Sequence, residues 1–186
     1  YEILKVIYQK GMSNVYLALD TELKTQWAIK EVVLNNTPKG KLEYQAILRE
    51  TNIIKQLSHP GIPRIVDLRE HNGSLFIVMD YIDGINVEET ILRAGVIPQE
   101  HVVLWAKQIA NLLGYLHNLP TPILYRDMKP SNVMIQADGT IKLLDFGVSE
   151  LLTPDNLIIR EGLGTKGYAA PEQGYVGEKY DLRTDI

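Results

Sequence analysis

The sequence predicts an α+β protein of two lobes, with a β-rich first lobe in residues 1–82 and a mainly helical second lobe in residues 83–186. Two observations support this division. Short runs rich in β-branched and aromatic residues, separated by polar turns, dominate the first part of the chain. The longest pattern of helical apolar spacing comes after Asp83-Gly84, where the character of the sequence changes. We therefore expect one sheet with one main helix, followed by a lobe built mainly from helices.

The first lobe contains segments with the composition of strands. They cover residues 1–7, 15–19, 26–33, 64–69 and 75–80. Between the third and the fourth segment, apolar residues recur with helical spacing from Lys41 to Leu57, and Pro60-Gly61 interrupts the pattern. Asn72-Gly73 separates the last two strands and is a strong signal for a hairpin turn. The first lobe is thus predicted to hold five strands and one helix.

The second lobe is predicted to begin its main helix at Pro98, because proline is tolerated at a helix start. The apolar residues of this helix cover much of its circumference: Val102, Val103, Leu104, Trp105, Ile109, Leu112, Leu113 and Leu116. We expect such a helix to be buried. A hairpin follows, with strands at 132–135 and 141–144 and a turn at Asp138-Gly139. The glycine- and proline-rich sequence after Leu152 predicts a long loop, and long loops inside a domain are usually functional.

The composition excludes several classes of function. The chain of 186 residues carries 19 Lys and Arg against 23 Asp and Glu, a net charge of −4, so nucleic acid is not expected as a partner. It holds no cysteine, which excludes disulfides, thiol nucleophiles and cysteine-ligated zinc. No apolar run reaches the roughly 18 residues that a membrane helix needs. We expect a cytoplasmic domain. Because the first residue is Tyr1 rather than Met, we expect a piece of a longer protein that could be membrane-anchored elsewhere.

Two loops around the predicted hairpin combine side chains that suit proton transfer and metal binding. The first places Asp127, Lys129 and Asn132 in a proline-stiffened loop, where they can present a proton acceptor, a cation and an amide ligand to one point. Taken alone, this loop could instead be a surface turn with scattered charges, although that is the weaker alternative. The second loop starts with Asp145-Phe146-Gly147 at the other end of the hairpin, so Asp145 and Asn132 can reach one cation. Mg²⁺ prefers such oxygen ligands and usually shares them with substrate phosphates. A plain hairpin that ends in an aspartate is the alternative.

These motifs, in this order, resemble those of Ser/Thr protein kinases over the whole chain. The corresponding segments are Trp27-Ala28-Ile29-Lys30, Glu50, Tyr125-Arg126-Asp127 with Asn132, Asp145-Phe146-Gly147, Gly164-Thr165 and Ala170-Pro171-Glu172. Gln173 is typical of the bacterial, eukaryotic-like branch of this family. The resemblance implies a two-lobed protein-kinase-like fold, of which this sequence would contain the N-lobe and part of the C-lobe. Because the family continues well past Asp185, we expect a C-lobe truncated before its last helices, with exposed apolar surface that could favour homo-association.

The resemblance also implies how ATP and Mg²⁺ would be held. Lys30 would bind the α- and β-phosphates of ATP, and Glu50 would fix the direction of that lysine. The alternative for this pair is a surface ion pair of about 0–1 kcal/mol. Asn132 and Asp145 would be the ligands of Mg²⁺.

The transfer step would use three further residues. By resemblance, Asp127 would orient the attacking hydroxyl group and accept its proton, a role worth on the order of 10²–10⁴-fold in rate. Lys129 would neutralise charge on the phosphoryl group in transfer. Lys129 and Thr165 favour Ser or Thr over Tyr as the acceptor, so Thr165 is grouped with the catalytic residues.

Adenine would lie between the lobes of such a fold. The expected contacts are Val15 and Ala28 above the ring, Met134 below it, Met79 behind it, and backbone groups of Asp80 and Ile82 in the connecting segment. Ordinary core packing is the alternative for these residues. The phosphate loop departs from the family, because it keeps Gly11 but has Tyr8, Lys10 and Ser13 where the family has glycines that let the backbone approach phosphates. We therefore expect an altered nucleotide affinity.

The segment between Asp145 and Glu172 is poor in hydroxyl side chains. Those it contains are Ser149, Thr153, Thr165 and Tyr168. By resemblance, Arg126 would hold a phosphate group on this segment, yet a good acceptor is hard to find. We therefore expect either that Glu161 or a partner substitutes for phosphorylation, or that Thr153 is phosphorylated.

The expected function is ATP- and Mg²⁺-dependent phosphoryl transfer to Ser or Thr hydroxyls of a protein substrate, as in a protein serine/threonine kinase of bacterial signalling. The glycine-poor loop and the end of the sequence also allow a pseudokinase, which would bind a nucleotide or a partner and regulate it. A small-molecule phosphotransferase is the third alternative. Gly164-Thr165 and Ala170-Pro171-Glu172 argue against it, because they resemble a platform for protein substrates.

Overall fold

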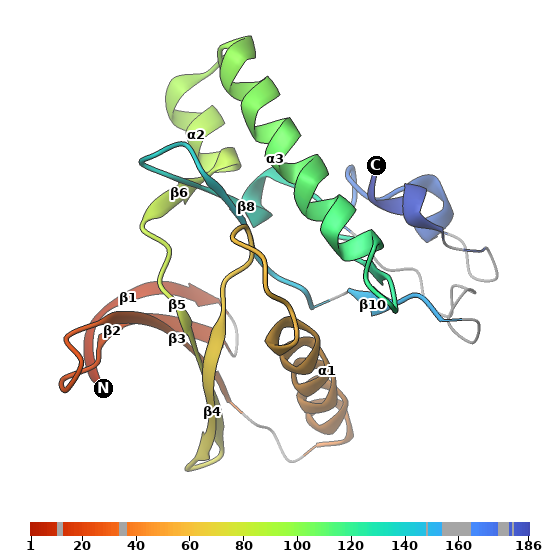
Figure 1. Cartoon of the computed structure of the whole chain (residues 1–186). Helices are drawn as coiled ribbons and strands as arrows, with labels where there is room; N and C mark the ends of the chain where they lie inside the picture. Colours follow the sequence, from red (N-terminus) through yellow and green to blue (C-terminus); the bar gives the residue numbers. More distant parts are fainter. Residues whose placement is uncertain (11–12, 34–36, 148, 154–164, 175–178, 180) are drawn as a thin grey trace. The chain divides into compact units, whose positions relative to one another are not determined.

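A computed structural model of the chain describes residues 1–10, 13–33, 37–147, 149–153, 165–174, 179 and 181–186. By its internal contacts the chain divides into two compact units. The first comprises Tyr1–Ser58 and Ile62–Asp83, and the second comprises His59–Gly61 and Gly84–Ile186. Helices and strands are mixed, which confirms the predicted α+β class (Figure 1). None of the described helices is long and apolar enough to cross a bilayer.

The first unit is built on a five-stranded antiparallel sheet, as predicted (Figure 1). Its strands are β1 (Glu2–Lys10), β2 (Ser13–Leu19), β3 (Gln26–Val33), β4 (Ile65–His71) and β5 (Ser74–Asp80). In space they follow the order β1-β2-β3-β5-β4. The hairpin predicted between β4 and β5 is confirmed, because Asn72 and Gly73 both have left-handed backbone angles, with φ of 48° and 75°. Such a pair of angles defines the two-residue turn whose twist matches that of the flanking strands.

One face of the sheet carries Lys30 together with several buried apolar residues. Lys30 on β3 lies opposite Val15 on β2 and Ile77 on β5, and residues at every second position of a strand share a face. The buried residues on this face are Leu17, Ala28, Val32, Leu75 and Ile77. Since Lys30 also reaches a glutamate of the helix α1 (Pro38–Lys55), as described below, α1 covers this face.

The helix α1 begins at Pro38, earlier than the predicted start at Lys41. The side chain of Thr37 caps it, because Thr37 Oγ1 accepts a hydrogen bond from the backbone N–H of Gly40 at 3.1 Å. Proline fits the first turn because its missing N–H would have no intrahelical partner there. The helix ends at the C-cap residue Gln56, close to the predicted end.

The second unit consists of two α-helices and several short elements within the described residues. In chain order they are β6 (Gly84–Asn86), α2 (Val87–Ala94), α3 (Gln99–His117), β7 (Ile123–Leu124), η1 (Pro130–Asn132), β8 (Val133–Gln136), β9 (Ile141–Leu143), β10 (Glu150–Leu151), η3 (Pro171–Gly174) and η4 (Leu182–Asp185), where η marks a 3₁₀ turn. The strands β8 and β9 form the predicted hairpin, and β6 adds a third strand beside β8. A separate two-stranded ribbon pairs β7 with β10.

The helix α2 and the strands β6, β7 and β10 are not predicted by the sequence. Asn86 caps α2, since its side chain accepts a hydrogen bond from Glu89 N at 2.7 Å. The helix has only 8 residues and none of them is buried, so it is shorter than the roughly 11–18 residues over which helical periodicity is recognised. The strands β7 and β10 have two residues each and exist only through their mutual pairing.

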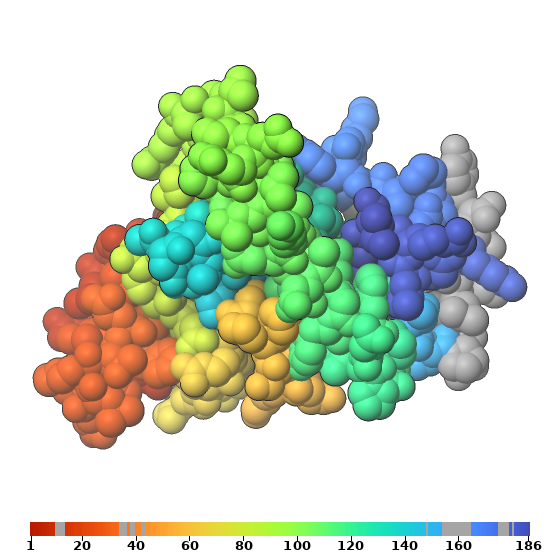
Figure 2. Space-filling model, turned by 45° about the horizontal axis from the view of Figure 1, so that its top comes forward, coloured from red at the N-terminus to blue at the C-terminus, as the bar shows by residue number. Residues whose placement is uncertain are grey.

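The helix α3 is less buried than the sequence predicts. Its buried side chains are Trp105, Leu112, Leu113 and Leu116. By contrast, Val102, Val103 and Leu104 expose 47%, 42% and 47% of their surface, so the prediction of a buried helix is wrong for its first turns. The buried residues form one stripe, and a rotation of about 100° per residue turns Val103 and Leu104 away from it. Figure 2 shows α3, in green, on the surface of the unit.

Candidate active site

The first unit contains the predicted pair of a strand lysine and a helix glutamate. Lys30 Nζ on β3 lies 3.9 Å from Glu50 Oε2 on α1. Lys30 shares its sheet face with Val15 and Ala28, and the Lys30 and Glu50 side chains are 26% and 11% exposed. The sheet therefore holds an ammonium group half-buried against a helix carboxylate, and its predicted use in phosphate binding stays a prediction.

The second unit brings together four of the predicted site residues, three of which bond to the carboxylate of the fourth. Asp127 lies in the loop between β7 and η1 and is 9% exposed. Lys129 Nζ donates to Asp127 Oδ2 at 2.6 Å, and Asn132 Nδ2 donates to the same oxygen at 2.9 Å and to the Asp127 carbonyl oxygen at 3.0 Å. Thr165 Oγ1 donates to Asp127 Oδ1 at 2.7 Å and accepts from Lys129 Nζ at 2.8 Å. The reading of this loop as a surface turn with scattered charges is therefore wrong.

The two predicted metal ligands lie at the same end of the β8–β9 hairpin. The register pairs Val133 with Leu143, and Leu144 N donates to the Asn132 carbonyl oxygen at 2.8 Å. Asp145 is the next residue after Leu144, so it lies close to Asn132 at this end of the hairpin. Because Nδ2 of Asn132 is used by Asp127, its Oδ1 is the amide atom that can ligate a cation. The Asp145 carboxylate is exposed and accepts a hydrogen bond from Gly147 N at 3.2 Å. One amide and one carboxylate oxygen fit Mg²⁺, which takes the remaining ligands from water and phosphates.

Tyr125 holds the chain just before Asp145. Its hydroxyl group donates to the carbonyl oxygen of Leu144, and its ring meets Phe146 edge-on, with centroids 5.2 Å apart at 75°. Burial and the nearby Asp145 carboxylate raise the pKa of the Tyr125 hydroxyl group. The phenol therefore stays protonated and keeps donating at physiological pH.

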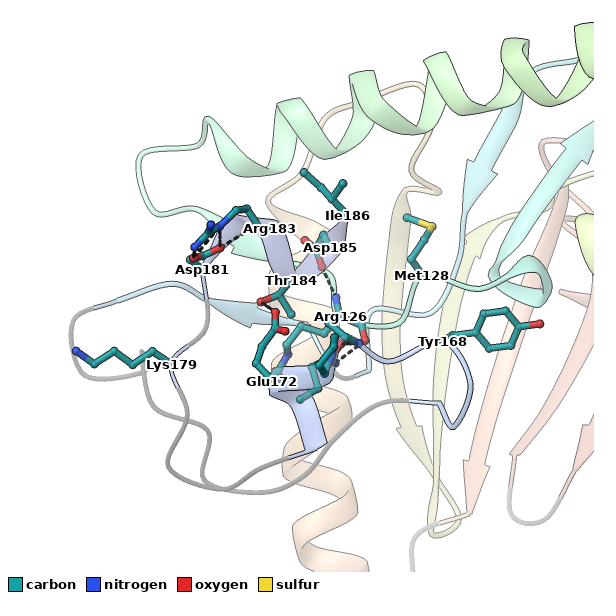
Figure 3. Close-up of a pocket in the computed structure, with 13 residues that line it drawn as sticks. Arg126, Met128, Tyr168, Glu172, Lys179, Asp181, Arg183, Thr184, Asp185 and Ile186 are labelled. Atoms are coloured by element: carbon teal, nitrogen blue, oxygen red, sulfur yellow. Dashed lines mark hydrogen bonds and ion pairs between the residues drawn. The ribbon is translucent and has the colours of Figure 1, made fainter.

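Sequence reasoning missed Asp185, which anchors the loop that carries Asp127. Its buried carboxylate accepts hydrogen bonds from the backbone N–H group of Arg126 at 2.7 Å (Figure 3) and from that of Tyr125 at 2.9 Å. Its Oδ2 also lies 2.8 Å from His117 Nε2. Charge-assisted bonds of this kind are about twice as strong as neutral ones. No spacing or composition signal marks this aspartate, because its partners are distant in sequence.

The residues predicted to contact adenine are divided between the units. Val15, Ala28, Met79 and Asp80 belong to the sheet of the first unit, Ile82 follows it, and Met134 lies on β8 of the second unit. The Asp80 carboxylate accepts two hydrogen bonds from the Arg64 side chain, at 2.9 and 3.1 Å, and Asp80 N donates to the Arg64 carbonyl oxygen at 3.0 Å. This takes the Asp80 N–H out of the predicted adenine contacts. Gly11 lies outside the described residues.

A cavity of about 630 Å³ lies beside the segment that carries Thr165, and no motif predicts it (Figure 3). Its walls come from the loop around Arg126, from the residues near Glu172 and from the end of the chain. Glu172 Oε1 accepts from Thr184 Oγ1 at 2.8 Å. Hydrogen bonds from Arg183 lower the pKa of Asp181 to about 2. The walls therefore carry charges of both signs, of which those of Asp181 and Arg183 are paired with each other.

Comparison with known proteins identifies the family. The family model described as "Protein kinase domain" matches residues 1–186. The chain is 33% identical over 186 residues to serine/threonine-protein kinase PrkC of Bacillus subtilis, covering 98% of this chain and 28% of that protein. It is 29% identical over 187 residues to the probable serine/threonine-protein kinase PknB of Lactococcus lactis, covering 100% and 29%. For CBL-interacting protein kinase 33 of Oryza sativa the identity is 31% over 188 residues, covering 98% and 41%.

The chain thus spans less than half the length of these relatives. The match nevertheless extends over every residue of this sequence, and the motifs that carry the resemblance occur in the expected order. The chain belongs to the protein kinase family, and its relatives include bacterial Ser/Thr kinases.

Proposed function

We propose that this protein transfers the γ-phosphoryl group of ATP, in the presence of Mg²⁺, to Ser or Thr hydroxyl groups of protein substrates. Residues 1–82 would act as the nucleotide-binding N-lobe and residues 83–186 as the part of the C-lobe that carries the chemistry. The observation that supports this best is the cluster of Lys129, Asn132 and Thr165 around Asp127. Such a cluster presents an oriented carboxylate beside a cation, which is the requirement of this reaction.

The hydrogen bonds of Asp127 define where the substrate hydroxyl would bind. A carboxylate offers about four lone-pair positions. Among the described residues, Lys129 and Asn132 donate to Oδ2, and Thr165 donates to Oδ1. A position on Oδ1 is therefore available for the proton of an incoming hydroxyl group. Asp127 accepts this proton as the hydroxyl oxygen bonds to the γ-phosphorus and the bond to the bridging oxygen of ADP breaks.

The other residues act by position and charge. Lys129 neutralises the negative charge of the transferred group while it stays bonded to Asp127 and Thr165. Lys30, directed by Glu50, holds the α- and β-phosphates. Asn132 and Asp145 would hold Mg²⁺, which supplies compensation of phosphate charge when bound. The convergence of these groups on one triphosphate is part of the proposal.

A regulatory pseudokinase is the second candidate, and the glycine-poor phosphate loop favours it. Tyr8, at a position where the family has glycine, is a bulky side chain that is 51% exposed on β1. Side chains in this loop keep the backbone away from phosphates. Nucleotide binding without transfer would be the mark of this function.

The decisive experiment measures transfer and binding separately. The protein is incubated with Mg²⁺ and radiolabelled ATP, with casein as the acceptor, beside an Asp127→Asn variant. We expect labelled protein with the wild type and a rate lower by about 10²–10⁴-fold with Asp127→Asn, because the amide cannot accept the proton. Binding of a fluorescent ATP analogue should be equal for both proteins. Binding without transfer in the wild type would leave the pseudokinase, and label on small molecules alone would favour a small-molecule phosphotransferase.

A further inference from the structure

Arg126, which lies directly before Asp127, is bonded through its main chain and its side chain at once. Its N–H donates to Asp185 Oδ1 at 2.7 Å, and its carbonyl oxygen accepts from Gln173 Nε2 at 3.0 Å. Its guanidinium group contacts a third segment, because Arg126 Nη1 lies 2.7 Å from Glu150 Oε2 on β10. Three separate parts of the second unit therefore meet at the residue that precedes the proposed catalytic base.

The pair with Glu150 is more buried than an ordinary surface ion pair. The Arg126 side chain is 5% exposed and the Glu150 side chain is 32% exposed. A cation that is withdrawn from water needs a carboxylate or a phosphate beside it, because an unpaired buried charge is strongly destabilising. In this protein, Glu150 places a carboxylate oxygen 2.7 Å from the Arg126 guanidinium group.

Glu150 is also fixed by its own strand. It pairs with Leu124 in the ribbon of β7 and β10. On one side of it, Ser149 Oγ donates to the Tyr125 carbonyl oxygen at 3.1 Å, and on the other, Leu152 N donates to the Pro122 carbonyl oxygen at 2.7 Å. The carboxylate is thus held on the loop 122–127 by backbone and side-chain bonds on both sides.

Arg126 also binds Gln173, which lies further along the chain after Thr165. Gln173 reaches the Arg126 carbonyl oxygen, while its Oε1 accepts from Ala170 N at 2.9 Å. Between the two ends, Thr165 bonds to Asp127. The segment that starts after Gly147 is therefore attached to residues 126 and 127 through positions 150, 165 and 173.

We propose that Glu150 is a positioning residue. Its carboxylate neutralises the charge of Arg126 without a phosphate group. In this way Glu150 attaches the segment that starts after Gly147 to the loop that carries Asp127. The sequence left open whether Glu161, which lies outside the described residues, or a partner substitutes for phosphorylation, or whether Thr153 is phosphorylated. The effect of Glu150 on the rate of phosphoryl transfer rests on the proposed function, whereas its attachment of the segment to the loop 122–127 does not. The protein is accordingly active in its unphosphorylated state, and its activity depends on the charge at position 150.

The test uses phosphatase-treated protein, with the absence of phosphate verified by intact mass. The variants are Glu150→Gln, which keeps the shape and removes the charge, and Glu150→Asp, which keeps the charge. The matched control is Glu89→Gln, which removes the carboxylate of the exposed ion pair of Glu89 with Arg93. Hydrogen exchange is followed at the amides of residues 123–127 and 149–153.

We expect Glu150→Gln to raise exchange in both stretches by about ten-fold or more, because the ribbon loses its ionic anchor. Its kcat/KM for the protein substrate should fall by about ten-fold while KM for ATP changes by less than about two-fold. Glu150→Asp should recover most of both effects, and Glu89→Gln should match the wild type.

Three results would overturn the proposal: unchanged exchange in Glu150→Gln, an equal response in Glu89→Gln, or an unphosphorylated wild type that becomes active only when a phosphate is added. Exchange is measurable without catalysis. If Glu150→Gln raises exchange but the wild type transfers no phosphate, the positioning role stands and the proposed kinase function fails. If Glu150→Gln does not fold, Glu150→Asp and the salt dependence of exchange in the wild type decide the question, since screening weakens a partly exposed ion pair.

Discussion

The two units hold their charged groups in different ways. In the first unit, one ion pair joins a strand to a helix, with 3.9 Å between Lys30 Nζ and Glu50 Oε2. In the second unit, the carboxylate of Asp127 receives three side-chain hydrogen bonds of 2.6–2.9 Å, and Asp185 receives two backbone bonds of 2.7 and 2.9 Å. The first arrangement depends on the position of one helix, whereas the second is fixed by several bonds. We therefore expect substitutions in the second unit to affect stability and those in the first to affect nucleotide binding.

The largest effect on stability is expected from Asp185→Asn. The amide presents one acceptor oxygen where the carboxylate presented two, so a buried backbone N–H of Tyr125 or Arg126 loses its partner. The free energy of unfolding should fall by about 3 kcal/mol. Urea unfolding can be followed by the fluorescence of Trp105 in a Trp27→Phe background, which reports on the second unit alone. The exposed Asp83→Asn serves as control, and an equal loss in both variants would contradict the role of Asp185.

A smaller change of stability, with a clear change of binding, is expected from Glu50→Gln. Because the pair is long and Lys30 is partly exposed, the free energy of unfolding should change by less than about 1 kcal/mol. KM for ATP should rise by about ten-fold, because Lys30 loses the group that directs it. Steady-state kinetics at varied ATP measure this, with the exposed Glu22→Gln as control. An unchanged KM would show that the pair does not serve nucleotide binding.

The smallest effect is expected at acidic pH, from Glu31 on β3. Hydrogen bonds from Tyr16 Oη at 2.7 Å and Asn14 Nδ2 at 3.2 Å hold the pKa of Glu31 below its ordinary value of 4.5. A carboxyl group with a lowered pKa stabilises the folded state above pH 4.5 and loses this contribution as the pH falls through its folded-state pKa. Between about pH 5 and 3 the wild type should lose up to about 1 kcal/mol more than Glu31→Gln.

This difference can be measured by urea unfolding with Trp27 as the probe in a Trp105→Phe background. Tyr16→Phe removes the strongest of the hydrogen bonds and should reduce the difference. A wild type and a Glu31→Gln variant with parallel pH profiles would rule out the contribution.

Sequence reasoning succeeded where structure is set by local rules. The strand β3 has the bounds that its β-branched residues predict, and Asn72-Gly73 forms the expected turn. The loop from Asp127 to Asn132 is compact because the two residues are close in the chain and bond directly to each other. Local composition and short spacing carry such information.

It failed where tertiary contacts decide the outcome. The apolar residues of α3 cover much of its circumference and predict a buried helix, yet Val103 and Leu104 lie outside the stripe that packs. Asp185 and Glu150 were missed because their partners lie far away along the chain, and an isolated acidic residue has no pattern. The roles of Lys30 and of the adenine-contacting residues came from resemblance, and together with the metal-binding role of Asp145 they stay predictions.

The left-handed backbone of Arg126 has a consequence for engineering this protein. With φ of 64°, a residue that carries a Cβ costs about 1–2 kcal/mol relative to the right-handed conformation, and glycine would avoid this cost. A stabilisation protocol that replaces left-handed residues by glycine would therefore select this position, and it would delete the guanidinium group together with the strain. The backbone conformation at position 126 favours glycine, whereas the ion pair with Glu150 requires arginine. Thermostability scores alone are therefore a poor guide to redesign in this part of the chain.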